Sequence, residues 1–306
     1  MSTSKIYNFM GLRKLATALS ALLLVISIAS LAINGLKFGL DFTGGSLVEI
    51  GYEKAPDLNQ IRGQLKASGY DDAVVQTFGT PTDILIRLGQ DHDPKLGDKV
   101  LSALQDGQDQ ALELRRNEFV GAQVGEELRE QGGLGMLLAL FMIMVYVAFR
   151  FQIKFSVGAV AALVHDVLLV LGFFSVLQLD FDLTVLAAVL AVIGYSLNDT
   201  IVVSDRIREN FRMMRKASPV EIMNASLSQT LGRTLVTSLT TLLVLVTLAL
   251  VGGEMIHGFA MALLVGVLVG TCSSIYVAAN VLLMMGICKE DLMPPEEKEE
   301  AVDELP

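Results

Sequence analysis

Charged residues are scarce in this chain. Of its 306 residues, 18% are Asp, Glu, Lys or Arg, and 52% are hydrophobic. This balance is too apolar for a soluble protein of that length and indicates a membrane protein. The formal net charge is −10, and the acidic residues gather between the first two apolar segments and in residues 289–306. Neither region has a basic patch with interleaved aromatic residues, so nothing supports binding to nucleic acid.

Cysteine is also scarce, with only Cys272 and Cys288 in the chain. Both fall in or at the end of the last apolar segment. The helix between them would separate them by about 24 Å at a rise of about 1.5 Å per residue. A disulfide cannot span that distance, so we expect two thiols that behave as small apolar residues.

The chain lacks the motifs of the common enzyme classes. It has no Gly-x-Ser-x-Gly, no phosphate-binding loop and no cluster of metal ligands, and His92 and His257 are isolated. An intramembrane aspartyl protease would need two carboxyl groups sharing a proton, and the Gly-x-Gly-Asp signature of that class is missing around Asp199. The sequence therefore predicts a protein that is not an enzyme, without a cofactor or a metal ion.

Long apolar runs are abundant. Six segments reach the length of about 17–25 residues that a helix needs to cross a bilayer. They are residues 15–33, 133–149, 155–177, 183–203, 231–251 and 257–287. The first run is too long for the apolar part of a signal peptide, and no cleavage site follows it, so we expect it to be retained as an anchor.

Basic residues lie in every second loop, which predicts the orientation. They are Lys5, Arg13 and Lys14 before the first span, Arg150 and Lys154 between the second and third, and Arg206, Arg208, Arg212, Arg215 and Lys216 between the fourth and fifth. Residues 178–182 and 252–254, in the opposite loops, contain no Lys or Arg. By the positive-inside rule, both termini are expected to be cytoplasmic. The protein is then a multi-pass membrane protein with its large loop on the non-cytoplasmic side.

That large loop, residues 35–132, has the pattern of a small α+β domain. Alternating apolar residues predict strands, and apolar residues at helical spacing predict helices. The expected order is strand 45–53, helix 58–68, strands 72–78 and 84–88, helix 97–112 and strand 113–120. The order β-α-β-β-α-β is that of a ferredoxin-like fold.

The predicted fold is therefore a polytopic α-helical membrane protein with a ferredoxin-like head between spans one and two. We divide the chain into four parts. They are residues 1–34 (cytoplasmic N-terminus and span one), 35–132 (head), 133–288 (spans two to six) and 289–306 (acidic cytoplasmic tail).

Asp199 is the most informative residue, because it lies within the fourth apolar segment. A carboxylate at bilayer depth costs about 2.5–3.5 kcal/mol on insertion scales, and such residues usually serve a proton or ion step. Spans four and five are antiparallel, which brings Arg233 to a similar depth. We expect these two residues to form an ion pair that protonation of Asp199 would break. Two alternatives stay open: Asp199 only hydrogen-bonds a neighbouring helix, and Arg233 only extends to the membrane surface.

Other polar residues at membrane depth complete the candidate relay. Asp166, near the middle of span three, is the second embedded acid, and its role is left open between packing and proton transfer. Its neighbour His165 is expected to be a hydrogen-bonded packing residue. Amide and hydroxyl groups can relay protons or hold water in a low-dielectric interior. The candidate proton relay is Asp199, Arg233, Asn198, Asp166 and Thr237.

Three stretches closely resemble the SecF family, the smaller membrane subunits of the bacterial SecDF protein-export complex. They are residues 38–45 (Phe-Gly-Leu-Asp-Phe-Thr-Gly-Gly), residues 192–210, which include Asn198-Asp199-Thr200, and residues 233–241, which begin with Arg233. The family belongs to the resistance-nodulation-division superfamily, whose halves each have six spans and an exported head. The resemblance implies that the family's key intramembrane acid is Asp199 and its key arginine Arg233.

The resemblance also implies a function, the use of the proton-motive force to promote late steps of preprotein export. The implied partners are SecD as a separate chain, the SecYEG translocon, YajC, the unfolded preprotein that emerges from the channel, and membrane lipids. Two alternatives stay open. One is half of a proton-driven efflux transporter for small hydrophobic molecules, and the other is a non-conducting scaffold for a partner subunit.

Overall fold

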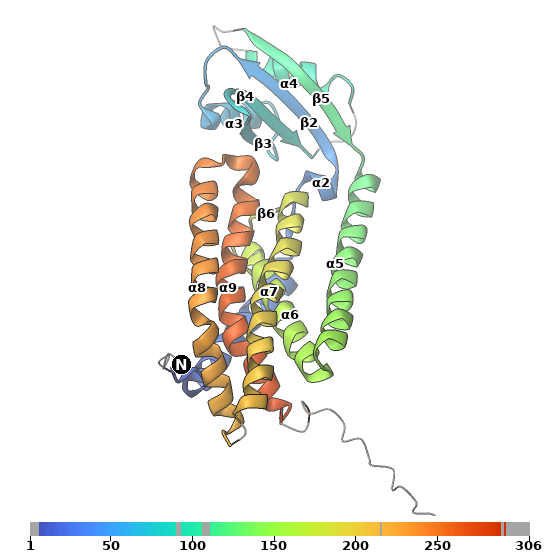
Figure 1. The fold of residues 1–306 in the computed structure, drawn as a ribbon. Helices are drawn as coiled ribbons and strands as arrows, with labels where there is room; N and C mark the ends of the chain where they lie inside the picture. Colours follow the sequence, from blue (N-terminus) through green and yellow to red (C-terminus); the bar gives the residue numbers. More distant parts are fainter. Residues whose placement is uncertain (1–5, 90–92, 106–110, 215, 289–290, 292–306) are drawn as a thin grey trace, which may run out of the picture.

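The structure is a computed structural model that describes residues 6–89, 93–105, 111–214, 216–288 and 291. Most of the predicted tail, residues 289–306, therefore lies outside the described residues. Within them, a bundle of long helices carries a small α+β head at one end (Figure 1). The opposite end of the bundle, where the N-terminus lies, is called the tail side below.

Six helices of the described chain are long and apolar enough to cross a membrane, which confirms the six predicted spans. They are α1 (Arg13–Ile33), α5 (Ala122–Arg150), α6 (Ile153–Leu177), α7 (Leu183–Met213), α8 (Pro219–Val251) and α9 (Glu254–Met284), and the short helix η1 (Phe9–Leu12) precedes α1. Helices α6, α7 and α9 form the centre of the bundle, where the described part of α6 buries residues from Phe155 to Ser175. Helices α1, α5 and α8 lie around this centre and expose large apolar side chains.

Two helices extend further than the apolar runs predict. The amphipathic residues before span two continue into it as the single helix α5. Helix α7 continues ten residues beyond Val203 to Met213, so Arg206, Arg208 and Arg212 lie in its last turns and not in a loop as predicted. Pairing of neighbouring polar side chains stabilises this extension of α7, as between Arg206 and Glu209 at 2.8 Å.

Short turns hold α8 at both of its ends. On the tail side, Ser218 and Glu221 form a capping box, with Pro219 in the first turn of the helix. This arrangement satisfies backbone N–H groups that a helix start leaves open. On the head side, only Gly252 and Gly253 separate α8 from α9, and Gly253 has a φ of 76°, which favours glycine.

The head has the predicted ferredoxin-like order. Its elements are β2 (Gly45–Tyr52), α3 (Leu58–Ala67), β3 (Val74–Phe78), β4 (Thr80–Leu88), α4 (Leu96–Gln105) and β5 (Leu112–Val120). The strand order is β3-β4-β2-β5, with every neighbouring pair antiparallel. Alternate residues such as Val48 and Ile50 of β2 and Ile84 and Ile86 of β4 are buried in one core with Ile61 of α3.

One helix boundary in the head was predicted wrongly. The helix expected over residues 97–112 ends at Gln105, residues 106–110 lie outside the described chain, and Leu112 begins β5. Leu112 lies at a helical spacing from Leu104, which suggests a longer helix. In the structure it pairs with Tyr52 of β2 and is buried in the core as part of the sheet. The other strands and helices of the head differ from the predicted bounds by a few residues.

A short strap joins the head to the bundle. Strand β1 (Lys37–Phe38) pairs in parallel with β6 (Asp180–Phe181), and the one-turn helix α2 (Leu40–Thr43) packs against α5. The rings of Phe38, Phe42 and Phe181 contact each other, with centroids about 6 Å apart. Asp41 Oδ2 accepts a hydrogen bond from the backbone N–H of Leu183 at 3.1 Å, so the strap also holds the first turn of α7.

The close packing of the strap requires a glycine in α5. A Cβ added at Gly125 would lie 2.7 Å from the backbone of Phe42, which cannot move aside as a flexible side chain can. Gly125→Ala is therefore expected to lower the free energy of unfolding by about 1–3 kcal/mol, the usual cost of overpacking. Thermal unfolding of the purified protein in detergent measures this change.

Gly133→Ala is the matched control, because it lies on the same helix with nothing within 4 Å of its added Cβ. Alanine is about 1 kcal/mol better than glycine inside a helix, so this variant is expected to be as stable as the wild type or more so. Equal melting temperatures for Gly125→Ala and Gly133→Ala would contradict the close contact.

At the tail side, Asp291 ties the end of the described chain to the start of α6. Its Oδ2 accepts hydrogen bonds from Lys154 Nζ at 2.6 Å and from the Cys288 N–H at 2.9 Å, and its carbonyl accepts one from Gln152. The hydrogen bond from Lys154 is the main cause that lowers the pKa of Asp291 from 3.8 to about 2.

A carboxyl group whose pKa is lowered in the folded state stabilises that state above its unfolded pKa and loses this effect as the pH falls. Asp291→Asn is therefore expected to reduce stability by about 1 kcal/mol near neutral pH, with the difference from wild type closing between about pH 4 and pH 2. Glu209→Gln, which breaks an exposed pair with Arg206, is the control and should change little. A difference that persists unchanged at pH 2 would refute the role of this carboxylate.

Candidate functional site

Asp199 lies in the middle of α7, and only 2% of its surface is exposed. It forms no hydrogen bond or ion pair with any other residue that the structure describes, and its Oδ2 is fully buried without a partner. The neighbouring hydroxyl Thr200 Oγ1 is buried and unpartnered in the same way. A buried polar group usually has a partner, so an unpaired carboxyl group at this depth is a strong indication of function.

The predicted ion pair between Asp199 and Arg233 is not formed. Arg233 is exposed on α8 and lies more than 4.0 Å from the carboxylate, although its charge is close enough to act on Asp199. The reason is the rotation of α8 about its axis. Thr230, Thr234 and Ser238 form the buried stripe of this helix, and Arg233 lies at the border of that stripe. Depth was predicted from the sequence, but the rotation of the helix was not.

The two relay residues with neutral side chains are not brought to Asp199. Asn198 is exposed on the surface of α7. The Thr237 hydroxyl donates to backbone carbonyls of its own helix, Arg233 at 3.1 Å and Thr234 at 3.0 Å. Such bonds within a helix are common for threonine and need no function. A relay role for these two residues stays a prediction.

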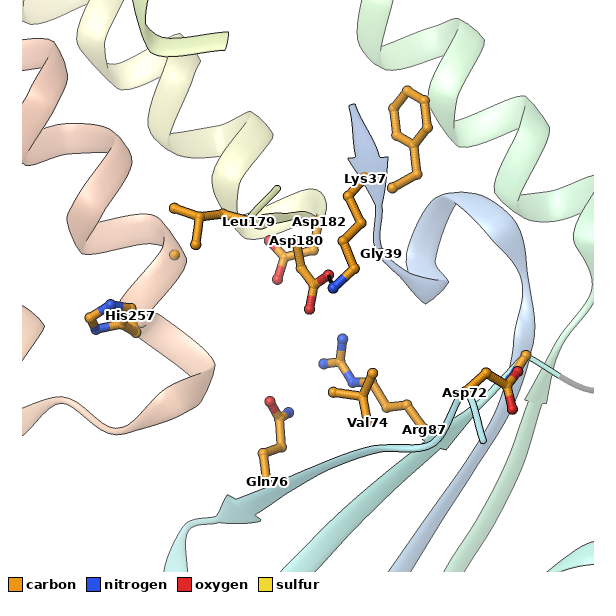
Figure 2. Close-up of a pocket in the computed structure, with 13 residues that line it drawn as sticks. Lys37, Gly39, Asp72, Val74, Gln76, Arg87, Leu179, Asp180, Asp182 and His257 are labelled. Atoms are coloured by element: carbon orange, nitrogen blue, oxygen red, sulfur yellow. Dashed lines mark hydrogen bonds and ion pairs between the residues drawn. The ribbon is translucent and has the colours of Figure 1, made fainter. Parts of the chain in front are cut away.

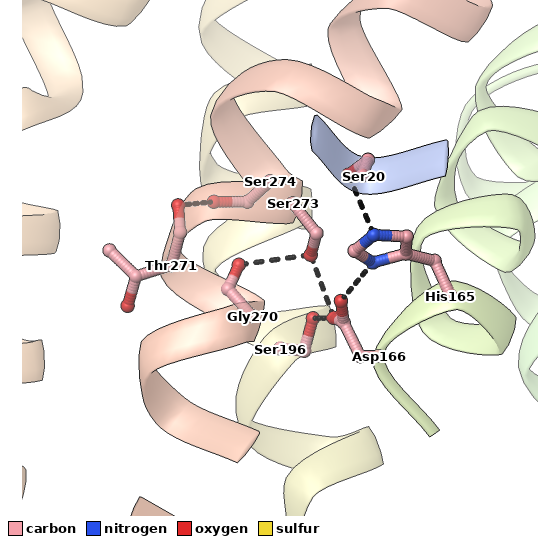
Figure 3. Close-up of polar contacts among 8 residues, drawn as sticks. All are labelled: Ser20, His165, Asp166, Ser196, Gly270, Thr271, Ser273 and Ser274. Carbon is pink, nitrogen blue, oxygen red and sulfur yellow. Dashed lines mark hydrogen bonds and ion pairs between the residues drawn. The ribbon is translucent and has the colours of Figure 1, made fainter. Parts of the chain in front are cut away.

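Asp166 lies in α6 at the centre of a hydrogen-bonded network (Figure 3). Its Oδ1 contacts His165 Nδ1 at 2.9 Å, and its Oδ2 accepts from the hydroxyls of Ser196 at 2.6 Å and Ser273 at 2.7 Å. On the other side of the ring, His165 Nε2 contacts the hydroxyl of Ser20 at 2.8 Å. The network joins four helices, α1, α6, α7 and α9.

The sequence analysis missed the three serines of this network. A signal for one of them was present: Gly270 lies on a face of small residues in span six, which predicts close helix packing. In the structure, a Cβ added at Gly270 would lie 3.1 Å from the Ser196 side chain and 3.5 Å from Asp166 Oδ2. Glycine there lets α9 approach closely enough for Ser273 to reach the carboxylate.

The two embedded acids are thus in opposite states. Asp166 is 1% exposed and accepts three hydrogen bonds, whereas Asp199 is as deeply buried and accepts none from the described chain. Hydrogen bonds to a carboxylate stabilise its charge, and burial without them favours the neutral acid. Asp199 is therefore the group whose protonation state the described chain leaves least fixed.

A separate cavity of about 390 Å³ lies between the head and the bundle (Figure 2). Arg87 of β4 points into it toward Lys37 and Asp180 of the strap, which pair with each other at 2.8 Å. No residue of the candidate relay lines this cavity. It concerns the contact between head and bundle and not the intramembrane acids.

Among the described residues, no group of three or more His, Cys, Asp and Glu side chains could hold a metal ion. Cys272 and Cys288 both remain thiols. The chemistry that the arrangement supports is the binding and release of protons at carboxyl and imidazole groups.

Comparison with known proteins defines the class to which this bundle and its head belong. Residues 100–287 match the family model for the C-terminal part of the protein export membrane proteins SecD and SecF. Residues 29–56, which contain the strap, match the SecD/SecF GG motif. The chain belongs to the SecD/SecF family of protein-export membrane proteins.

The relatives specify the branch of the family. The chain is 55% identical to the protein translocase subunit SecF of Pseudomonas aeruginosa, over 98% of this chain and 97% of that protein. It is 50% identical to the SecF subunit of Vibrio alginolyticus, over 100% and 99% of the two chains. The crystal structure of SecDF from Thermus thermophilus superposes with a TM-score of 0.80 at 35% identity. That match covers 93% of this chain but only 39% of the SecDF chain.

The different surroundings of the two acids predict different effects on stability. Asp166→Asn replaces an acceptor of three hydrogen bonds and leaves buried donors unpaired, so it is expected to lower the free energy of unfolding by about 2 kcal/mol. Asp199→Asn loses no hydrogen bond with the described chain, so it is expected to stay within about 0.5 kcal/mol of wild type. Unfolding in a denaturing detergent measures both. Equal destabilisation by the two substitutions would contradict this reading of the site.

Proposed function

We propose that this chain is a proton-coupled auxiliary subunit of Sec protein export that acts together with a separate SecD-type subunit. Relatives that match nearly the whole chain are protein translocase subunits named SecF. The match with the SecDF chain of Thermus thermophilus covers 39% of that chain, which supports a SecD-type partner for the rest of such an assembly. The efflux alternative has no support in these relatives. The proposed role requires no covalent chemistry.

The orientation follows from the basic residues of the loops and the helix ends. The tail side, with both termini, faces the cytoplasm, and the head of residues 35–132 faces the periplasm. In that orientation the head meets the unfolded preprotein after it leaves the SecYEG channel. YajC is a further expected member of the assembly.

The observation that carries the proposal is the buried carboxyl group of Asp199, which has no partner within the described chain. A neutral carboxyl at this depth is stable, and an ionised one needs a counter-charge or water. Arg233 of α8 is the candidate for that charge after a rotation of the helix, although its side chain is exposed in this structure. The outward faces of α5 and α8 are apolar and exposed, so we assign the partner subunit or lipid to them.

Proton binding at Asp199 would change the position of α7 relative to α8. Because Asp41 of the strap holds the first turn of α7 through Leu183, a shift of α7 reaches the head directly. The energy is sufficient: one charge moved through about 100 mV yields about 2.3 kcal/mol. That biases a two-state element by roughly 50-fold.

The test is Asp199→Asn in the full chain, assembled with its SecD-type partner and the translocon in membrane vesicles. We expect proton flux and the proton-motive-force-dependent part of preprotein export to fall at least about tenfold, since an amide cannot take up a proton. Arg233→Ala is expected to reduce flux similarly, because it removes the cation of α8 whose charge acts on the ionised carboxyl group.

Asp205→Asn is the matched control, an exposed acid on the same helix, and it should leave both flux and export close to wild type. Normal flux and export with Asp199→Asn, in a complex that copurifies intact, would overturn the proposal. That result would favour the non-conducting scaffold.

A further inference from the structure

His165 has a position that a packing residue does not require. It is buried, yet its ring lines a groove of about 220 Å³ between α1, α6 and α9. The lining is mostly apolar, with a few polar groups: Ser20 contacts the ring, and the amide of Asn280 donates to Thr17 Oγ1 at 2.8 Å. Tyr276 adds a further hydroxyl group.

The groove lies toward the tail side of the bundle. Thr17 is in the second turn of α1, which begins at that side, and Ser20 follows one turn later. Seven residues of helix separate Ser20 from Arg13, a rise of about 10 Å. Thr17 and Ser20 thus place hydroxyl groups on successive turns of α1, between the tail-side end of that helix and the ring of His165.

The hydrogen-bond geometry lets the ring gain a proton without losing a contact. An ionised Asp166 only accepts hydrogen bonds, so His165 Nδ1 carries a proton and donates it to Oδ1. In the neutral ring, Nε2 then accepts from the Ser20 hydroxyl. When Nε2 is protonated it becomes the donor, and the Ser20 hydroxyl turns its own proton to a carbonyl of its helix, as serines in helices commonly do.

The charges around the ring favour this site. Asp166, on the same helix, neutralises the imidazolium directly at 2.9 Å. Helix α1 contributes the neutral Ser20, α9 contributes Tyr276, and α7 contributes Ser196 with Asp199 one turn away. No Lys or Arg is among the described residues that line the groove.

We propose that His165 is a second proton-binding site of this chain, that Asp166 is its counter-ion, and that it exchanges protons with the tail side through the groove beside Ser20. Its role in transport rests on the proposed function above. A hydronium ion that reaches the ring from the tail side transfers its proton to Nε2 and leaves as water, and the same nitrogen later returns the proton to water. The His165–Asp166 pair is also linked to α7, because Ser196 donates to Asp166 and lies one turn from Asp199.

The first test observes the ring itself and does not depend on transport. This chain alone is labelled with ¹⁵N-histidine before assembly with its unlabelled partner, and His92→Gln and His257→Gln leave His165 as its only histidine. If His165 binds and releases protons, the ¹⁵N shifts of its two ring nitrogens change as the pH is varied across neutrality. Ring nitrogens that keep one protonation state throughout would overturn the proposal.

The second test measures the pH profile of proton flux in vesicles. His165→Gln keeps a hydrogen-bonding side chain but cannot bind a proton, so flux near neutral pH is expected to fall about tenfold and its pH profile to lose one titration step. Ser20→Ala removes the group that links the ring to the groove, and it is expected to slow flux several-fold while the ring still titrates.

Ser30→Ala is the matched control for Ser20→Ala. It also removes a hydroxyl contact between α1 and α6, with Ser175 at 2.8 Å, but lies outside the His165 network. It is expected to leave flux and its pH profile unchanged. Copurification with the partner subunit verifies that each variant assembles.

The outcomes separate the two proposals. If Asp199→Asn abolishes flux while His165→Gln keeps the wild-type rate and pH profile, His165 has only a structural role and the second site is refuted. If Asp199→Asn leaves flux intact, the proposed function fails, and the titration of the ring still decides whether His165 binds protons.

Discussion

The free energy of a charged group in a low-dielectric interior is the constraint on which this structure depends. The bundle accommodates two embedded acids in different ways. Ser196, which donates to Asp166, lies one turn of α7 away from Asp199. Asp166 accepts hydrogen bonds from two other helices and from its own neighbour His165, so its charge is stabilised and the helices are held together. Asp199 has no such donors within the described chain. One acid thus fixes the centre of the bundle, and the other is left able to change its state.

The sequence was sufficient for the architecture because the signals are long and redundant. Six apolar runs predict six spans, and the alternation in segments such as Gly45–Tyr52 predicts the strands of the head. Asp199 could be singled out because a carboxylate is rare in such a run. What the sequence could not supply is the rotation of one helix about its axis relative to another. Arg233 was predicted to pair with Asp199 but is exposed on α8, and Ser20 and Ser273 were missed because a single serine in an apolar helix carries no signal about its neighbour.

The connection between head and bundle shows the same limit in another form. Gly44 and Gly45 have φ values of 74° and 139°, which favour glycine, and they follow the strap directly. The strap itself consists of the helix that contains Asp41 and a parallel pair of short strands. The partners of this strap, Asp180 and Phe181, lie about 140 residues away in sequence. Only the fold brings them together, and it does so at the first turn of the helix that carries Asp199.

Helix α8 is confined at both ends by turns of a few residues, a capped start after Ser218 and the pair Gly252–Gly253. A helix held by such short turns cannot move far along its axis without moving α7 and α9 as well. The freedom left to it is to roll or to tilt about those two anchor points. Rolling would carry a long basic side chain such as Arg233 through an arc without stretching the backbone, so a large change in charge placement requires almost no change in the overall outline of the protein.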